Sequence, residues 1–164
     1  MNPARYRIEL QGVLQGVGFR PFVYRLAQQL GLRGSVRNTG SGVIVEVEGP
    51  AESLQTFLAR LEAERPPASV ILARRIVELP AIGDEEFRIE PSQQEADKLA
   101  GLLPDLATCT DCLRELFDPS NRRYLYPFIN CTQCGPRYTI IRAIPYDRPN
   151  TTMHEFRMCE DCSR

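Results

Sequence analysis

All six cysteines of the chain lie in its last 56 residues, where they form three Cys-x-x-Cys pairs. Eighteen residues separate the first pair from the second, and 24 separate the second from the third. This spacing is typical of a structural zinc site, because each pair supplies one edge of a thiolate tetrahedron and the loop brings two edges together. The candidate ligands are Cys109, Cys112, Cys131, Cys134, Cys159 and Cys162.

Two pairs complete one zinc site, so one pair is left over. Consecutive pairing of the first two pairs and interleaved pairing both give four ligands, and loop length slightly favours the consecutive arrangement. The single histidine, His154, stands five residues before Cys159. We expect it to be a solvated or hydrogen-bonded surface residue and leave it out of the metal set.

Clustered cysteines also occur as disulfide frameworks or redox dithiols, but disulfide frameworks belong to short secreted chains. Residues 1–9 carry two arginines and no apolar segment of a signal peptide. No apolar run approaches the roughly 20 residues that a membrane span requires. We therefore expect a reducing, cytoplasmic location and no membrane partner.

Charge argues against nucleic-acid binding. Residues 1–91 hold 11 arginines and 11 acidic residues, and residues 92–164 hold nine basic and ten acidic residues. Neither part is a basic patch, whereas contacts of cationic side chains with phosphates supply most nonspecific nucleic-acid affinity. We therefore expect no nucleic-acid partner.

The first 91 residues alternate between strand-like and helix-like patterns. An alternating run at Tyr6–Leu10 is followed by a glycine-rich loop, and Pro21 then suits the first turn of a helix that ends at Gly31. The remaining elements are strands at 35–37 and 43–47 around a turn at 38–42, a helix around 54–61, and strands at 70–79 and 86–90. The order, βαββαβ plus a terminal strand segment, predicts an α+β fold, a ferredoxin-like sandwich of two helices on one antiparallel sheet.

The composition changes after this sandwich. Residues 91–98 are polar, and the cysteine-rich part follows. We predict a domain at 1–91, a linker at 92–104 and a small zinc-finger region with four cysteine ligands at 105–164, with one complete repeat and a second that is truncated.

The loop Gln15-Gly16-Val17-Gly18-Phe19-Arg20 precedes a helix and could bind an anion. Glycines allow backbone N–H groups to converge at the positive end of the helix dipole, and the Arg20 guanidinium can hold two phosphate oxygens. A short glycine motif is a weak signal, and an ordinary turn beside an exposed arginine remains the alternative.

Two segments resemble the acylphosphatase family: Gly12-Val13-Leu14-Gln15-Gly16-Val17-Gly18-Phe19-Arg20 and Gly34-Ser35-Val36-Arg37-Asn38-Thr39-Gly40-Ser41-Gly42. The resemblance implies that Arg20 and the amides of Gln15, Gly16, Val17, Gly18 and Phe19 hold phosphate, while Asn38 orients the attacking water. The implied reaction is hydrolysis of an acyl phosphate. No histidine or cysteine lies in residues 1–91, so we expect the bound phosphate itself to take the proton of the water.

The cysteine-rich part resembles the HypF family of hydrogenase-maturation carbamoyltransferases. The similar residues are Cys109-Thr110-Asp111-Cys112 and the run from Arg122 to Tyr138. The resemblance implies the N-terminal portion of a larger enzyme, whose missing domains form an adenylate and transfer the carbamoyl group. That enzyme would use carbamoyl phosphate and ATP to carbamoylate the C-terminal cysteine of a HypE-type partner, in the pathway to the cyanide ligand of the nickel-iron centre.

Two interpretations of function remain open. In one, the sandwich hydrolyses carbamoyl phosphate or another acyl phosphate; in the other, it is catalytically idle and the chain is a docking platform. Tyr124, Tyr126 and Phe128 could form a nucleic-acid surface, but we expect them to pad a zinc module that is too small to build its own core.

Overall fold

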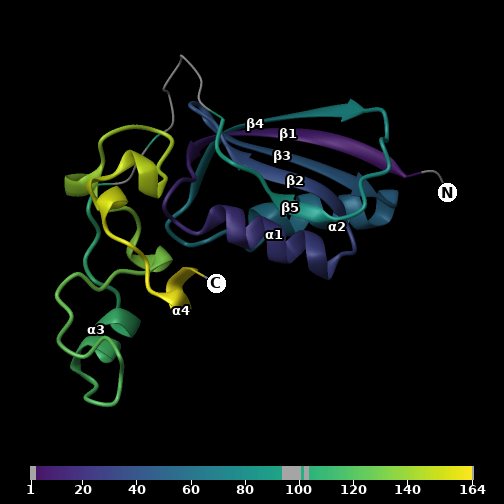
Figure 1. Cartoon of the computed structure of the whole chain (residues 1–164). Helices are drawn as coiled ribbons and strands as arrows, with labels where there is room; N and C mark the ends of the chain where they lie inside the picture. Colours follow the sequence, from purple (N-terminus) through teal and green to yellow (C-terminus); the bar gives the residue numbers. More distant parts are fainter. Residues whose placement is uncertain (1–2, 94–100, 102–103, 164) are drawn as a thin grey trace.

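The computed structural model describes residues 3–93, 101 and 104–163, with the side chains of the last two residues of that range left out. An α/β sandwich occupies the N-terminal half, and a smaller irregular module lies at one end of it (Figure 1). Among the described residues, no helix is long and apolar enough to span a membrane.

The sandwich contains one five-stranded sheet in the order β4-β1-β3-β2-β5. Neighbouring strands are antiparallel except β2 and β5, which are parallel. The strands are β1 (Ala4–Val13), β2 (Arg33–Asn38), β3 (Gly42–Gly49), β4 (Val70–Leu79) and β5 (Phe87–Ile89).

Two helices cover one face of this sheet, α1 (Phe19–Gln29) and α2 (Ala51–Ala63) (Figure 1). The alternating residues Ile8 and Leu10 of β1 turn toward the helices and are at most 1% exposed. They pack with the apolar stripes of the helices, including Val23 of α1 and Phe57 of α2. The predicted βαββαβ sandwich is therefore confirmed, because period-two and period-3.6 patterns meet in one core.

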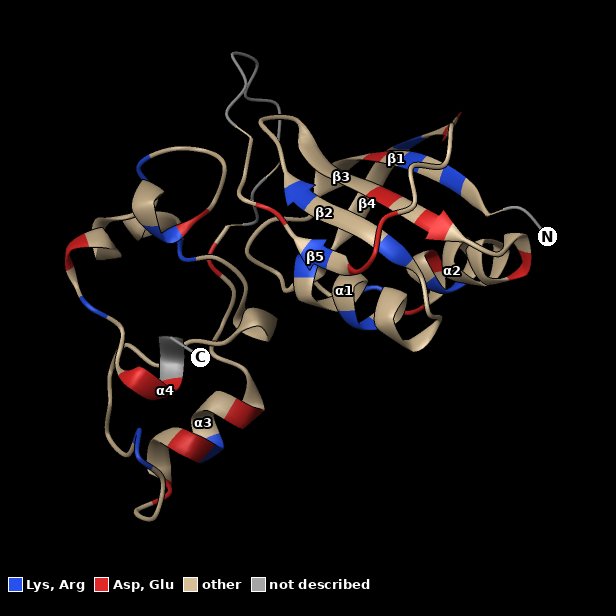
Figure 2. Cartoon of the chain, turned by 45° about the vertical axis from the view of Figure 1, so that its right-hand side comes forward, with Lys and Arg blue, Asp and Glu red and all other residues tan. Residues whose placement is uncertain are grey.

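The opposite face of the sheet is charged, and Figure 2 shows basic and acidic segments side by side on its strands. Arg5 donates to Glu46 at 2.5 Å, and Arg37 contacts Glu46 at 3.6 Å and Glu90 at 2.9 Å. Ion pairs between strands thus explain the charged residues that alternate with apolar residues along these strands.

The prediction of a wholly antiparallel sheet is wrong for the last strand. After β4 the chain passes Glu48, whose carboxylate accepts the N–H groups of Ile82 and Gly83 at 2.8 and 2.9 Å. The chain then joins the edge of the sheet beside Gly34 of β2. The N–H of Gly34 donates to the carbonyl of Glu86 at 2.9 Å, and β5 runs parallel to β2. A three-residue strand carries no pattern from which its direction can be predicted.

The C-terminal module consists mainly of loops and short helical turns. It contains α3 (Thr110–Phe117), four 3₁₀ turns at η1 (Thr132–Cys134), η2 (Tyr138–Ile140), η3 (Arg148–Asn150) and η4 (Thr152–Glu155), and the short helix α4 (Glu160–Ser163). Its buried cluster consists of Ile129 and two cysteines, with Leu116 packed beside them. So little apolar burial requires another stabilising element, which a bound metal ion can supply.

The expectation that aromatic residues pad this module is wrong. Tyr124, Tyr126 and Phe128 are 45%, 46% and 74% exposed. The rings of Tyr126 and Phe128 pack edge to face, with their centroids 5.9 Å apart, and neither residue belongs to the buried cluster around the cysteines.

Candidate anion site and thiol cluster

The glycine loop connects β1 to α1 at the end of the sandwich nearest the C-terminal module. Gly16 and Gly18 have φ angles of 74° and 77°, a conformation that favours glycine, and Gly18 caps α1. In the described part of the chain, the backbone N–H groups of Gly16, Val17 and Gly18 donate no hydrogen bond. Because backbone donors without a protein acceptor need water or a ligand as their partner, this loop has donors available for a ligand.

Arg20 lies in the first turn of α1, and its side chain is 23% exposed. Its Nη2 atom donates to Asp147 Oδ1 at 2.6 Å, and its Nη1 atom donates to Ser92 Oγ at 3.3 Å. The Ser92 hydroxyl in turn donates to the other carboxylate oxygen of Asp147. The guanidinium therefore already contacts one anion, which comes from the C-terminal module.

Asn38 is the last residue of β2 and is 1% exposed. With its amide oxygen directed at the guanidinium, Oδ1 accepts from Arg20 Nη2 at 3.1 Å and from Nε at 3.2 Å. The structure thus brings the two predicted catalytic residues together from different elements. This orientation leaves the amide NH₂ group of Asn38 as a donor.

Gln15 has a role that the sequence did not indicate. Its side chain is almost fully buried, and Nε2 donates to the carbonyls of Thr39 and Gly42 at 2.9 and 3.2 Å. Its Oε1 accepts the N–H of Tyr146 at 2.7 Å. Gln15 therefore joins the glycine loop, the β2–β3 turn beside Asn38 and the C-terminal module.

The C-terminal module lies directly against the glycine loop. A Cβ atom at Gly16 would be 2.8 Å from both Pro136 Cβ and Tyr146 Cδ1, and one at Gly18 would be 3.0 Å from Thr132 Cβ. Glycine is thus required here for close approach as well as for backbone conformation. A side chain at Gly16 would require Pro136 or Tyr146 to shift, and one at Gly18 would require a smaller shift of Thr132.

A cavity of about 360 Å³ opens beside Arg20. Pro91 and Ser92 contribute to its wall from the end of the sandwich, and Pro145, Asp147, Pro149 and Asn150 contribute from the C-terminal module. Arg20 and Asp147 are the charged residues in this wall, with opposite signs. The cavity is therefore shared between the two parts of the chain.

Four thiols form a second candidate site, and they are the first two cysteine pairs in consecutive pairing. Cys109 Sγ lies 3.6 Å from Cys131 Sγ, Cys131 Sγ lies 3.8 Å from Cys134 Sγ, and Cys134 Sγ lies 3.7 Å from Cys112 Sγ. All four sulfur atoms lie within 4.8 Å of one another. Sulfur atoms bound tetrahedrally to Zn²⁺ at about 2.3 Å are about 3.8 Å apart, so these thiols fit a metal site.

Burial acts to raise the pKa of Cys112, Cys131 and Cys134, and hydrogen bonds add to this effect or oppose it. Burial raises the pKa of Cys112, and the neighbouring sulfur atoms raise it further. Burial also raises the pKa of Cys131. At Cys134 burial is outweighed by hydrogen bonds to the sulfur, among them one from the N–H of Cys109 at 3.3 Å, and the pKa is lowered to about 7.

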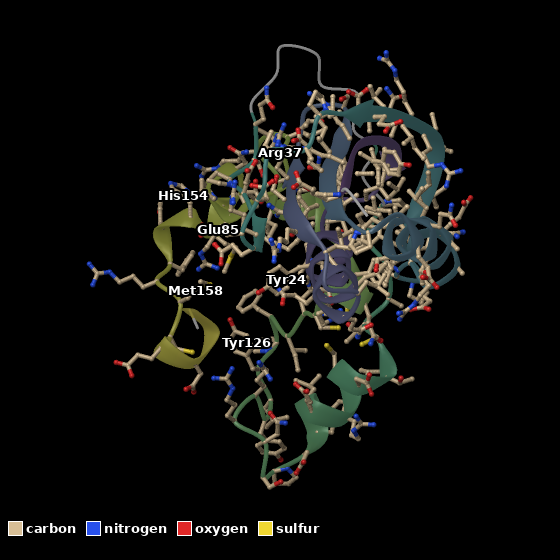
Figure 3. All side chains as sticks on the ribbon, turned by 90° about the vertical axis from the view of Figure 1, so that its right-hand side faces the viewer. Tyr24, Arg37, Glu85, Tyr126, His154 and Met158 are labelled. Carbon is tan, nitrogen blue, oxygen red and sulfur yellow. The ribbon has the colours of Figure 1, made fainter. Side chains whose placement is uncertain are left out.

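Of the third cysteine pair the structure describes the side chain of Cys159, which does not join this cluster. Cys159 is exposed, and Arg122 Nη1 lies 3.6 Å from its sulfur. The side chain of Cys162 lies outside the described residues, so metal binding by this pair stays a prediction. His154 lies at the outer edge of the C-terminal segment (Figure 3), with Nδ1 3.0 Å from the carbonyl of Thr151, as expected for a hydrogen-bonded surface residue.

Sequence reasoning missed Asp147 and Ser92. Asp147 is separated from Arg20 by 127 positions, and neither Asp147 nor Ser92 belongs to a motif that we identified. Most of the predicted linker at 92–104 lies outside the described residues, so its boundaries stay predictions. Its first residues do contact the site, since the N–H of Gln93 donates to the carbonyl of Asn38 at 2.8 Å.

Two family models match the chain. The acylphosphatase family matches residues 6–89, and the HypF finger matches residues 108–141. Together they cover both the glycine loop and the four clustered cysteines.

Known proteins show the same two similarities. The carbamoyltransferase HypF of Synechocystis is 54% identical over 92% of this chain, and the match spans 19% of that protein. The acylphosphatase of Thermotoga maritima is 39% identical over 51% of this chain and 93% of its own length. The crystal structure of full-length HypF in its phosphate- and nucleotide-bound form superposes on 99% of this chain and 22% of its own, with a TM-score of 0.94 and 45% identity. The chain therefore spans about one fifth of the length of the HypF relatives it matches.

Proposed function

Since the chain belongs to the acylphosphatase family and carries a HypF finger, we propose that its sandwich hydrolyses an acyl phosphate at Arg20, Asn38 and the Gln15–Phe19 loop. The observation that carries this proposal is the adjacency of Arg20 and Asn38 beside a loop in which the N–H groups of Gly16, Val17 and Gly18 have no protein acceptor among the described residues.

Phosphate binding follows from the charges and donors of the loop. A phosphate dianion would accept hydrogen bonds from the free N–H groups of Gly16, Val17 and Gly18 and from the guanidinium of Arg20. These donors stabilise the negative charge that gathers on the departing phosphate oxygens as the bond to the acyl carbon lengthens. Arg20 must exchange Asp147 for phosphate to take part.

Asn38 would position the water. Its Oδ1 is held by Arg20, so its NH₂ group remains to donate to the water oxygen. The water oxygen forms a bond to the acyl carbon, and the bond between that carbon and the bridging oxygen breaks. Phosphate leaves with the bridging oxygen and takes one proton from the water, so no further base is required.

Carbamoyl phosphate is the substrate that the HypF relatives suggest, since they are named carbamoyltransferases. Its hydrolysis yields phosphate and carbamate. We propose that the carbamate enters an ATP-dependent carbamoylation of a HypE-type protein, for which the parts of the HypF relatives outside the matched region would be responsible. Cytoplasmic location and the absence of a nucleic-acid partner remain predictions from the sequence.

Zinc is the metal we propose for the thiol cluster. Cys109, Cys112, Cys131 and Cys134 would hold it in a structural site, because four cysteines close the coordination shell and leave no position for a substrate. The ion would supply the stability that the small apolar core of the module lacks.

Phosphate release from carbamoyl phosphate tests the hydrolytic proposal. We expect Arg20→Ala to abolish release, and Asn38→Ala to lower the turnover number while inorganic phosphate still binds. Arg25→Ala is the matched control, because Arg25 lies on the same helix with an exposed side chain. Unchanged rates in both site variants would remove the assignment.

A catalytically idle docking platform is the second candidate, and the ion pair between Arg20 and Asp147 favours it. If that pair never opens, the anion site is occupied by the protein itself. Calorimetric titration with inorganic phosphate separates the two candidates: a permanently closed pair gives no binding in the wild-type chain but measurable binding in Asp147→Asn.

A further inference from the structure

Asp147 brings a carboxylate from the C-terminal module to the anion site of the sandwich. Its Oδ1 atom lies 2.6 Å from Arg20 Nη2, and its other oxygen accepts the hydroxyl of Ser92. Both charged side chains are only about one quarter exposed, so solvent screens this pair weakly. Asp147 thus contacts the cation that the proposed function assigns to phosphate.

The cavity beside Arg20 offers open space for the acyl group of a substrate whose phosphate binds to Arg20. If the loop N–H groups and Arg20 hold the phosphate oxygens, the side of the phosphate that faces away from the loop is left for the acyl group. The open volume next to Arg20 is the 360 Å³ cavity, and Asp147 is the acidic residue in its wall. When phosphate replaces Asp147 on the guanidinium, the hydrogen bond from Ser92 would still hold the carboxylate at the wall of this cavity.

A carboxylate selects among acyl groups by their chemistry. An ionised carboxylate only accepts hydrogen bonds, so it favours an acyl group with N–H donors over one with a methyl group. It also repels an acyl group that carries its own negative charge. A site built to bind an N–H group discriminates strongly against an analogue that lacks it, because its polar atoms are then left unpaired.

We propose that Asp147 is a specificity-determining residue, supplied by the C-terminal module, that selects neutral acyl phosphates bearing an N–H donor. This inference rests on the proposed acyl-phosphate site but does not require turnover. It assigns to the C-terminal module a direct part in substrate choice, in addition to any structural role.

Phosphonates, which are not hydrolysed, allow the proposed selection among acyl groups to be measured as differences in binding affinity. Phosphonoacetamide carries an amide NH₂ group, acetonylphosphonate carries a methyl group in its place, and phosphonoacetate carries a carboxylate. We expect the wild-type chain, titrated by calorimetry, to bind phosphonoacetamide about 10-fold or more tightly than acetonylphosphonate, and phosphonoacetate most weakly.

Two substitutions separate charge from hydrogen bonding. Asp147→Asn removes the charge and keeps an acceptor oxygen, so it should abolish discrimination against phosphonoacetate while part of the preference for phosphonoacetamide remains. Asp147→Ala removes both and should bring all three affinities within about 3-fold of one another. Asp161→Asn in the same module, with a side chain that is 69% exposed, is the matched control and should keep the wild-type order.

Inorganic phosphate then tests whether Asp147 instead holds Arg20 in place. If Asp147 only competes with ligands, both variants should bind phosphate at least as tightly as the wild type. Loss of phosphate binding in both variants, equal wild-type affinities for the three phosphonates, or an unchanged order in Asp147→Ala would each overturn the inference. A wild-type chain with the expected order that hydrolyses no acyl phosphate would contradict the proposed function and leave the assignment of Asp147 intact.

Discussion

Replacing Gly16 with alanine should weaken the contact between the two modules, and Gly31→Ala provides a control for backbone strain. Both glycines have positive φ angles, 74° at Gly16 and 63° at Gly31. Either alanine therefore costs about 1–2 kcal/mol for the left-handed conformation. The two sites differ in their surroundings, because a Cβ at Gly31 meets nothing within 4 Å.

At Gly16 the new methyl group must displace Pro136 or Tyr146, which lie 2.8 Å from the ideal Cβ position. Such overpacking costs about 1–3 kcal/mol. We therefore expect Gly31→Ala to lower the free energy of unfolding by about 1–2 kcal/mol and Gly16→Ala by about 2–5 kcal/mol. Urea denaturation of the zinc-loaded chain measures both values.

Tyr146→Ala identifies the source of the difference. The substitution removes the ring that crowds Gly16, while the backbone N–H of residue 146 keeps its bond to Gln15. The additional cost of Gly16→Ala should then fall by about half, as a double-mutant cycle would show. Equal costs at Gly16 and Gly31 would refute the proposed close contact between loop and module, and an unchanged cost in the Tyr146→Ala background would exclude the ring as its cause.

Three further predictions concern single side chains. Gln15→Met keeps the size of the side chain but removes two buried hydrogen bonds and one that is partly buried, so urea denaturation should show a loss of about 2–4 kcal/mol in the free energy of unfolding, and a loss below about 0.5 kcal/mol would contradict it. Burial acts to raise the pKa of Glu46, but its hydrogen bond and attraction to Arg5 outweigh burial and lower that pKa. The ion pair therefore stabilises the fold fully above about pH 4.3, the ordinary pKa of a glutamate, and this stabilisation is lost as the pH falls through the lowered pKa of the folded state. The melting temperature of Glu46→Gln should accordingly lie below that of the wild type at pH 7 and approach it at pH 3, and a constant difference would argue against this linkage. Metal analysis should find about one zinc per chain, lost in Cys134→Ser and retained in the control Cys159→Ser; equal zinc contents in the two variants would count against the four-thiol site.

The elements of the sandwich could be predicted because local pattern and tertiary burial agree there. Ile8 and Leu10 alternate with charged residues, and they are buried against helices whose own stripes include Val23 and Phe57. Arg20 and Asn38 were predicted as one site from their motifs, and the structure places them in contact.

Long-range polar contacts could not be predicted. The ion pair between Arg20 and Asp147 depends on how the C-terminal module packs against the sandwich, and the periodicity of the sequence gives no information about that packing. The role of the Gln15 side chain could not be predicted for the same reason, since its partners lie in two distant segments, the β2–β3 turn and the C-terminal module. The exposure of Tyr126 could not be predicted either, because an aromatic residue in the sequence shows that apolar surface is present but does not show whether other residues bury it.

The cavity with walls from both parts of the chain constrains how these parts can diverge. A substitution in the 132–147 segment changes the surroundings of Gly16 and Arg20, so it alters the sandwich as directly as a mutation in its own loop. Exchange of either part for its counterpart from a distant relative would join surfaces that were never selected together. The two parts should therefore be inherited and recombined as a single unit, despite their unrelated folds.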